Sequence, residues 1–304
     1  MRTLLAMTMV AAAILERAQV VRAQTAAGPS AATRSCRETP GADALWSNPD
    51  HRFLVFGEAH GTNEIPELFG DVVCQASASR PVVVAVEWPP DLQASLDAYM
   101  ASDGSEAART RFLAAAFWSN PMPVGRTSQA MFRLIERLRA LKASGRRVSV
   151  KTFEARVGLT FRQDYRELEM AQNLATIANS DPARPLVFVL TGNLHAGKLR
   201  YASMGGLLAA AGHLPPAEVV SLDAARNGGE TWGCFSSKPP GVQVTLKDIV
   251  CGPHPWPLAP GGIMPRGITI TPTQGGMYDG VYSSGAPLTA SAPPKRSGPA
   301  PAGD

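Results

Sequence analysis

Residues 53 to 62 of the chain read Phe-Leu-Val-Phe-Gly-Glu-Ala-His-Gly-Thr, and residues 186 to 195 repeat the pattern as Leu-Val-Phe-Val-Leu-Thr-Gly-Asn-Leu-His. Each stretch is an apolar run of strand length that breaks at a Gly-x-x-His. Each run therefore predicts a buried β-strand with a histidine just past its carboxyl end. Ligands of open α/β sheets bind along that edge. His60 and His195 are thus the first candidates for a functional site.

Apolar runs of similar length recur along the chain. We expect strands over residues 52–57, 81–86, 147–153, 185–191 and 217–222, and a last one over 277–283. A helix is expected from Thr127 or Ser128 to about Ala143. A second helix is expected over residues 162–178, with an apolar stripe of Tyr165, Leu168, Ala171 and Leu174. This alternation predicts an α/β fold with a mostly parallel central sheet and helices on both faces.

Polar side chains follow the expected strands. They are Glu58 and His60 after the first strand, Glu87 after the second, Glu154 after the third, Asn193 and His195 after the fourth, and Asp223 after the fifth. A parallel sheet gathers these ends along one edge. Carboxylates beside imidazoles perform general acid–base chemistry or bind a divalent metal. We predict a catalytic site of Glu58, His60, Glu87 and His195. Glu154 and Asn193 are candidates for substrate binding, although acids in the positions of Glu154 and Asp223 are more often helix caps or solvated loop acids.

A further helix is expected directly after His60. Thr62 or Asn63 can cap this helix, and Pro66 is tolerated in its first turn. Its free N–H groups would then face the cleft and favour a negatively charged ligand or a developing oxyanion. Glu64 is a candidate substrate-binding residue at this helix end. The alternative is that its carboxylate complements the helix dipole.

The start of the chain has the pattern of a secretory signal over residues 1–23. Arg2 precedes an apolar run, and a small-residue cleavage site follows it. We therefore expect a periplasmic or secreted protein with one α/β domain over residues 24–285. Residues 286–304 are rich in Pro, Ala, Ser and Gly and are expected to be disordered. We expect no membrane insertion after removal of the signal, because no later apolar stretch is long enough to span a bilayer.

Four cysteines agree with export, because disulfides persist in oxidising compartments. Four cysteines allow three pairings. We favour Cys36 with Cys74 and Cys234 with Cys251, because each pair brackets a short stretch; buried free thiols are the alternative. The absence of a Cys-x-x-Cys pair from the sequence argues against a cysteine zinc site.

The formal net charge of +4 does not point to an anionic partner. Basic residues are scattered along the sequence, and those over residues 137–147 surround the end of one expected helix, where cations complement the helix dipole. We therefore expect a small-molecule or peptide substrate and no nucleic acid.

Four short motifs resemble those of one known superfamily. Residues 57–64, Gly-Glu-Ala-His-Gly-Thr-Asn-Glu, are similar to the G-E-x-H-G-T-x-E signature of erythromycin esterase-like and ChaN-like proteins, a superfamily that includes the Tiki/TraB proteins. Residues 84–87 resemble its strand that ends in a glutamate. Residues 165–173 resemble its R-D-x-x-M-A-x-N helix, and residues 192–195 its second histidine motif. The resemblance spans residues 52 to 223.

This resemblance implies a role for each matching residue. It implies that His60 is a general base that activates water, and that Glu58 and Glu87 orient it or bind a metal. It also implies that His195 is the second imidazole across the cleft and that Arg166 is a partner for a substrate carboxylate or an oxyanion.

The branches of the superfamily imply different functions. Esterase-like members imply hydrolysis of an ester or lactone, whereas Tiki-like members imply a metal-dependent peptidase with Glu58, His60, Glu87 and His195 as candidate ligands of Mn²⁺ or Zn²⁺. ChaN-like members imply an exported haem- or ligand-binding protein, but no tyrosine or histidine pattern singles out haem. The absence of a Gly-x-Ser-x-Gly elbow argues against an ordinary serine esterase. We expect a hydrolase of an ester, lactone or amide, with a non-catalytic carrier as the alternative.

Overall fold

The computed structural model of the chain describes residues 36–120, 124–156, 163–199, 214–239 and 241–295. The described residues belong to one compact unit. The expected signal sequence, residues 1–23, lies outside the described residues.

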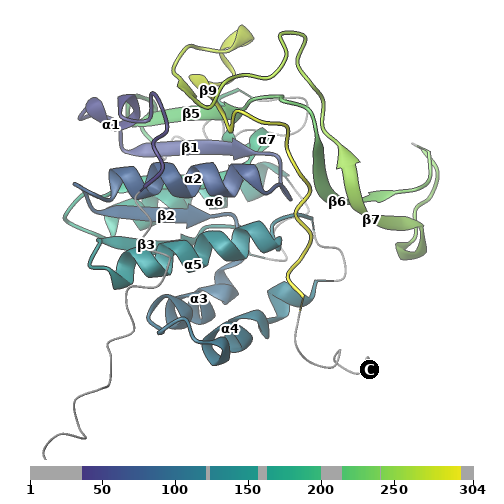
Figure 1. The fold of residues 1–304 in the computed structure, drawn as a ribbon, viewed down its shortest axis with the longest axis horizontal. Helices are drawn as coiled ribbons and strands as arrows, with labels where there is room; N and C mark the ends of the chain where they lie inside the picture. Colours follow the sequence, from purple (N-terminus) through teal and green to yellow (C-terminus); the bar gives the residue numbers. More distant parts are fainter. Residues whose placement is uncertain (1–35, 121–123, 157–162, 200–213, 240, 296–304) are drawn as a thin grey trace, which may run out of the picture. The chain divides into compact units, whose positions relative to one another are not determined.

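A seven-stranded sheet forms the centre of this unit (Figure 1). Its strands are β1 (Phe53–Glu58), β2 (Val82–Val86), β3 (Val148–Thr152), β4 (Leu186–Gly192), β5 (Val219–Ala224), β8 (Gly267–Thr269) and β9 (Gly280–Ser283). Their order is β3-β2-β4-β1-β5-β9-β8, and all neighbours are parallel except β8 with β9. The predicted fold class is confirmed. All six expected strands are present, with small shifts of their bounds.

A second, two-stranded sheet escaped the sequence analysis. It consists of β6 (Glu230–Ser236) and β7 (Ile249–Pro255), which pair in antiparallel fashion. We call this sheet the ribbon; the arrows of β1 and β2 point towards it in Figure 1. Exposed and partly exposed side chains occur along both strands. Neither strand therefore has the apolar run of a buried strand. The N–H of Trp232 in the ribbon donates a hydrogen bond to the carbonyl oxygen of Gly61, 2.8 Å away.

Helices cover both faces of the sheet (Figure 1). They are α1 (Ala44–Ser47), α2 (Glu64–Ala76), α3 (Gln93–Met100), α4 (Glu106–Leu113), α5 (Gln129–Ala143), α6 (Gln163–Asn179) and α7 (Asn193–Ala196). Short 3₁₀ helices lie at Pro90–Leu92, Ala116–Ser119, Pro216–Glu218, Leu246–Asp248 and Gln274–Gly276. Leu54 and Phe56 of β1 pack with α2 and α5, whereas Phe53 and Val55 pack with α6. β1 is therefore buried on both faces, as expected for a central parallel strand.

The two helices predicted from apolar spacing are present. α5 follows Ser128, whose side chain accepts a hydrogen bond from the N–H of Met131. The expected stripe of α6 is partly wrong, because Tyr165 is 52% exposed. The fully buried positions of α6 are Glu167, Met170, Ala171, Leu174 and Ala178. The prediction considered apolar side chains only, so it could not identify the carboxylate of Glu167 as part of the buried face.

Both expected disulfides are confirmed. One joins Cys36 to Cys74, and the other joins Cys234 to Cys251. Two disulfides are compatible with an extracellular or periplasmic protein. Among the described residues, we find no helix that is long and apolar enough to cross a membrane.

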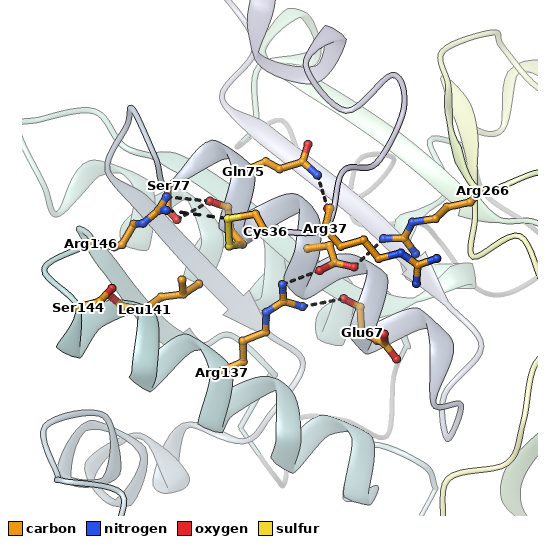
Figure 2. Close-up of a disulfide and its surroundings, with 12 residues drawn as sticks. Cys36, Arg37, Glu67, Gln75, Ser77, Arg137, Leu141, Ser144, Arg146 and Arg266 are labelled. Atoms are coloured by element: carbon orange, nitrogen blue, oxygen red, sulfur yellow. Dashed lines mark hydrogen bonds and ion pairs between the residues drawn. A yellow bond between two sulfur atoms is a disulfide. The ribbon is translucent and has the colours of Figure 1, made fainter. Parts of the chain in front are cut away.

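Figure 2 shows how the Cys36–Cys74 bond is surrounded. Arg146 donates a hydrogen bond to the carbonyl oxygen of the second cysteine, 3.0 Å away. On the same helix, α2, the buried carboxylate of Asp71 accepts hydrogen bonds from Arg137 at 2.5 Å and from Arg266 at 2.6 Å. These arginines come from α5 and from the loop before β8, so one carboxylate connects three segments that are distant in sequence.

Residues 286–295 do not form the disordered tail that composition predicted. Leu288 is only 3% exposed and forms a bridge with Gly229 beside the ribbon. Ala290 forms a bridge with Thr62, in the loop that follows His60. We call residues 286–295 the C-terminal strap. Composition misled here because a segment held mainly by backbone hydrogen bonds needs few apolar side chains.

Candidate active site

The two Gly-x-x-His motifs meet at one edge of the sheet. β1 and β4 are parallel neighbours, with Glu58 paired to Gly192 at their carboxyl ends. β2 lies on the other side of β4 and ends one residue before Glu87. The prediction that the ends of these strands share an edge is therefore confirmed.

His60 is held by the carboxylate that precedes it. Its Nδ1 lies 2.8 Å from Oε1 of Glu58, whose side chain is 3% exposed. A proton shared in this contact lies on Nδ1, which leaves Nε2 as the basic atom, 3.7 Å from Oε2 of Glu87. Burial lowers the pKa of His60, but the carboxylates of Glu58 and Glu87 raise it by more. The pKa of His60 is therefore above its ordinary value.

His195 repeats this arrangement on the neighbouring strand. Its Nδ1 lies 2.5 Å from Oε1 of Glu167, a fully buried side chain of α6. Its Nε2 lies 2.9 Å from Nη1 of Arg166. Because a guanidinium can only donate, Nε2 of His195 is the acceptor in that contact. His195 is therefore less available than His60 to take a proton from water.

Glu87 lies between the two histidines, and both of its oxygens accept hydrogen bonds. Oε2 accepts from the hydroxyl of Thr191 at 2.7 Å and from the N–H of Gly192 at 2.8 Å. Oε1 lies 3.1 Å from Nη1 of Arg126 and 3.0 Å from Nη2 of Arg166. Glu87 thus fixes the carboxyl end of β4 and two arginines at the same time.

Glu154 completes a cluster of two carboxylates and two guanidiniums. Its Oε2 lies 2.7 Å from Arg126 and 2.5 Å from Arg166. Burial raises the pKa of Glu87, but the positive charges of His60 and Arg126 are the main causes that bring it well below its usual range. Burial lowers the pKa of Arg166, yet Glu154 and Glu87 raise it overall. Glu87 and Arg166 therefore both stay ionised at neutral pH.

These contacts do not fit a divalent metal. The oxygens of Glu87 already accept from protein donors, and Arg166 occupies Nε2 of His195. Two guanidiniums beside the carboxylates also oppose the binding of a cation. Within the described residues, no group of three His, Cys, Asp or Glu side chains could hold a metal ion. The interpretation of Glu58, His60, Glu87 and His195 as metal ligands is therefore not supported.

A cleft of about 340 Å³ lies beside the two histidines. Its polar wall contains Glu58, His60, Asn193 and His195. Its lining also contains the apolar side chains of Val124, Leu194, Trp232, Phe235 and Trp256, which we call the apolar wall. A larger hollow over the second half of α6 has no charged side chain in its lining. We therefore place the candidate active site in the cleft beside the histidines.

Glu64 does not line this cleft. Its carboxylate accepts hydrogen bonds from the N–H of Thr289 at 2.8 Å and from the hydroxyl of Thr289 at 2.5 Å. The N–H of Asn63 donates to the carbonyl oxygen of the same threonine, at 3.0 Å. The prediction that this helix end faces a ligand is therefore wrong, because the C-terminal strap takes that place. Neither Thr62 nor Asn63 gives the expected side-chain cap; Asn63 is the N-cap residue, and its side chain makes no capping hydrogen bond.

The remaining predicted residues occupy different positions. Asn193 lines the cleft. Arg166 and Glu154 lie outside its lining; Arg166 contacts Nε2 of His195, and Glu154 pairs with Arg126. Asp223, at the end of β5, also lies outside the lining. Burial raises the pKa of Asp223 to about 6, and its partners include the side chain of Asn193.

Sequence reasoning missed Arg126 and Glu167. Glu167 adjoins Arg166 in the helix motif, so a search for a carboxylate partner of the second histidine could have found it. Arg126 has no comparable signal. It lies in a loop before α5, and only the fold brings its guanidinium to Glu87 and Glu154.

The sequence matches no protein-family model and no curated protein. Several solved structures nevertheless resemble the chain. One is an erythromycin esterase variant, EreC, in its open conformation, with 9% identity and a TM-score of 0.56 over 80% of this chain and 92% of that chain. A Bacillus cereus protein has 10% identity and a TM-score of 0.48 over 86% of this chain and 96% of its own. A succinoglycan biosynthesis protein has 10% identity and a TM-score of 0.45 over 80% of this chain and 89% of its own.

Identities near 10% indicate a shared fold and do not indicate a shared reaction. Of these three structures, only the EreC variant has a TM-score high enough to support an argument about the fold. The likeness to ChaN-like and Tiki proteins stays a prediction from the motifs. The likeness to EreC extends over most of both chains. The chain therefore has an erythromycin esterase-like fold.

Proposed function

We propose that the protein is a hydrolase that uses His60 to activate water for attack on an ester, a lactone or an amide. The observation that supports this proposal is the pairing of His60 with buried Glu58 at the edge of the cleft, with Nε2 left as the basic atom. The erythromycin esterase-like fold agrees with a hydrolase. We also propose that the protein acts in the periplasm or outside the cell, which the two disulfides support.

In this mechanism, water lies between Nε2 of His60 and the carbonyl carbon of the substrate. As the water oxygen attacks, its proton passes to Nε2, and the carboxylate of Glu58 stabilises the imidazolium that forms. The carbonyl oxygen becomes negatively charged. His60 then returns the proton to the leaving oxygen or nitrogen, the bond to the carbonyl carbon breaks, and an acid and an alcohol or amine are released.

His195 and Arg166 have a different role in this proposal. The developing oxyanion needs nearby positive charge or hydrogen-bond donors. Arg166, whose side chain is 17% exposed, contacts both His195 and Glu87. We propose that the positive charge of Arg166 stabilises the oxyanion from behind the cleft lining, while His195 and Glu154 hold the guanidinium in place and Glu167 orients His195.

A substrate screen tests this function. Purified protein is incubated with neutral esters, lactones and peptides in buffer that contains a metal chelator, and products are followed by chromatography. We expect hydrolysis of at least one ester or lactone without added metal. Hydrolysis only after addition of Mn²⁺ or Zn²⁺ would contradict the mechanism. A lack of turnover on all substrates would contradict the function and favour a non-catalytic carrier.

The variant Glu58→Gln is expected to change the pH dependence of the reaction. His60 must be neutral to accept a proton, and Glu58 helps to raise its pKa, so wild-type kcat/KM falls as the pH drops through this raised value. Without the carboxylate the pKa of His60 is lower, so the fall occurs at lower pH and the plateau is also reduced. The measurement is kcat/KM between about pH 5 and pH 9. An inflection at the wild-type pH would contradict the assignment of His60 as the base.

The variant Gly192→Ala is expected to block the site. A Cβ atom at Gly192 would lie 3.0 Å from Nε2 of His60 and 3.4 Å from Cδ2 of His195. The backbone φ of Gly192 is −56°, so alanine causes no backbone strain there. Because the methyl group occupies the space next to the base, kcat/KM should fall by about 10²-fold or more. Gly261→Ala is the matched control, since a Cβ atom at Gly261 meets nothing within 4 Å. Full activity of Gly192→Ala would place the reacting water elsewhere.

A further inference from the structure

The apolar wall of the cleft is exposed to solvent. Phe235 is 55% exposed, Val124 41% and Leu194 40%, and all three line the same cleft. Exposed apolar side chains that stand alone are common, but several that line one concave site together with polar groups are typical of a ligand-binding groove. The wall therefore needs an explanation beyond the packing of the fold.

The ring of Phe235 is exposed but held in place. Its centroid lies 4.3 Å from that of His254, with the two rings at 69°. The ring also covers Gly233, where an added Cβ atom would come within 2.5 Å of Cε2 of Phe235. The disulfide between Cys234 and Cys251 joins the two strands of the ribbon directly beside it. A rigid exposed ring gains affinity for a ligand because little side-chain entropy is lost on binding.

The charge of the cleft restricts what the wall can bind. Among the residues described in the lining there is no lysine or arginine. The carboxylate of Glu58 lines the cleft, and its buried Oε2 has no hydrogen-bond partner in the structure. A ring that carries a carboxylate or phosphate would therefore find no cation to pair with in the lining, and its burial against the ribbon would cost desolvation free energy. An uncharged ring has no such cost.

We infer that the wall binds a flat, uncharged, apolar ring of the substrate, and that Phe235 provides the surface on which this ring packs. The substrate class is then an aryl ester, or a lactone or amide with an aryl group, whose carbonyl reaches His60 while the ring rests against the ribbon. The position of the carbonyl rests on the proposed function. The binding of the ring does not, because it requires no hydrolysis.

Binding without turnover tests the inference. The probe is benzyl methyl ketone, which has the shape of phenyl acetate but no bond that water can cleave, and its affinity is measured by calorimetry. The comparison ligands are an aliphatic ketone of similar size and the same aryl ketone with a ring carboxylate. We expect wild-type protein to bind the aryl ketone about tenfold more tightly than either comparison ligand.

Variants of the ribbon locate the ring. Phe235→Ala is expected to remove the preference for the aryl ketone. Gly233→Ala keeps the phenylalanine but displaces its ring, so it should weaken binding in the same direction. Val250→Ala is the matched control, because Val250 is the cross-strand partner of Phe235, is also 55% exposed, and does not line the cleft. We expect Val250→Ala to bind like wild type.

The outcomes separate this inference from the proposed function. Equal affinity for the aryl and aliphatic ketones, or unchanged aryl binding in Phe235→Ala, would overturn the inference, even if esters are hydrolysed. Loss of aryl binding in Phe235→Ala, with no hydrolysis of any ester by wild type, would support the inference and contradict the proposed function. If both hold, Phe235→Ala should raise KM for aryl esters about tenfold and leave KM for aliphatic esters unchanged.

Discussion

His60→Asn is expected to lower kcat/KM for the hydrolysed substrate by about 10²–10⁴-fold, the range of a positioned general base. Asparagine is close in size to histidine and still polar, so it can keep a hydrogen bond to Glu58. It cannot accept a proton from water. The measurement is kcat/KM at a pH above the raised pKa of His60, together with the melting temperature. We expect the melting temperature to change little, because the side chain of His60 is 24% exposed.

Two other histidine variants serve as controls for this result. His51 lies outside the cleft, with Nδ1 3.0 Å from the carbonyl oxygen of Leu45, so His51→Asn should retain full activity. His195→Asn should reduce activity because Arg166 loses the side chain that positions its guanidinium near the oxyanion, and the pH at which activity falls should stay the same. Unchanged turnover in His60→Asn would remove this residue from the mechanism.

Ending the chain after Gly285 is expected to destabilise the whole unit. This truncation removes the C-terminal strap, including Leu288, which is 3% exposed. It also removes the carbonyl of Leu288 that accepts from the N–H of Glu230 at 2.8 Å. Loss of one buried leucine costs about 2–5 kcal/mol. In a domain of this size the melting temperature should fall by roughly 4–20 °C, which thermal unfolding followed by circular dichroism measures.

A second truncation distinguishes the strap from the residues beyond it. Ending the chain after Lys295 keeps every strap contact and should leave the melting temperature unchanged. Leu288→Ala should account for much of the loss caused by the longer truncation. If both truncations unfold at the wild-type temperature, the strap does not stabilise the unit.

The central sheet could be predicted because its strands carry a local signal. β1, β2 and β4 are fully buried, so their sequences are continuous apolar runs that end sharply at glycine or glutamate. β6 and β7 carry no such signal. They are held by pairing with each other and by the disulfide between Cys234 and Cys251, and many of their side chains are exposed. The cysteine spacing correctly predicted this disulfide. It did not reveal that Cys234 and Cys251 lie opposite each other in two paired strands.

The core of the candidate site was predictable for a topological reason. Parallel strands bring their carboxyl ends together, so Glu58, His60, Glu87 and His195 had to meet if the sheet was parallel. The contacts of Arg126 and Glu64 were not predictable in this way. Arg126 reaches Glu87 from a loop, and Glu64 binds a strap whose composition suggests disorder. Both contacts depend on chain segments whose path the local sequence does not determine.

The carbonyl oxygen of Gly61 links three parts of the molecule. It accepts the N–H of Trp232 from the ribbon and the N–H of Ser291 from the strap, each at 2.8 Å. The residue directly before it is His60. A movement of the ribbon away from the cleft would break the first of these bonds, so the ribbon side of the cleft and the general base His60 are coupled in position. A compound that wedges the ribbon open from outside the cleft should therefore inhibit the reaction by misplacing His60, without competing with the substrate.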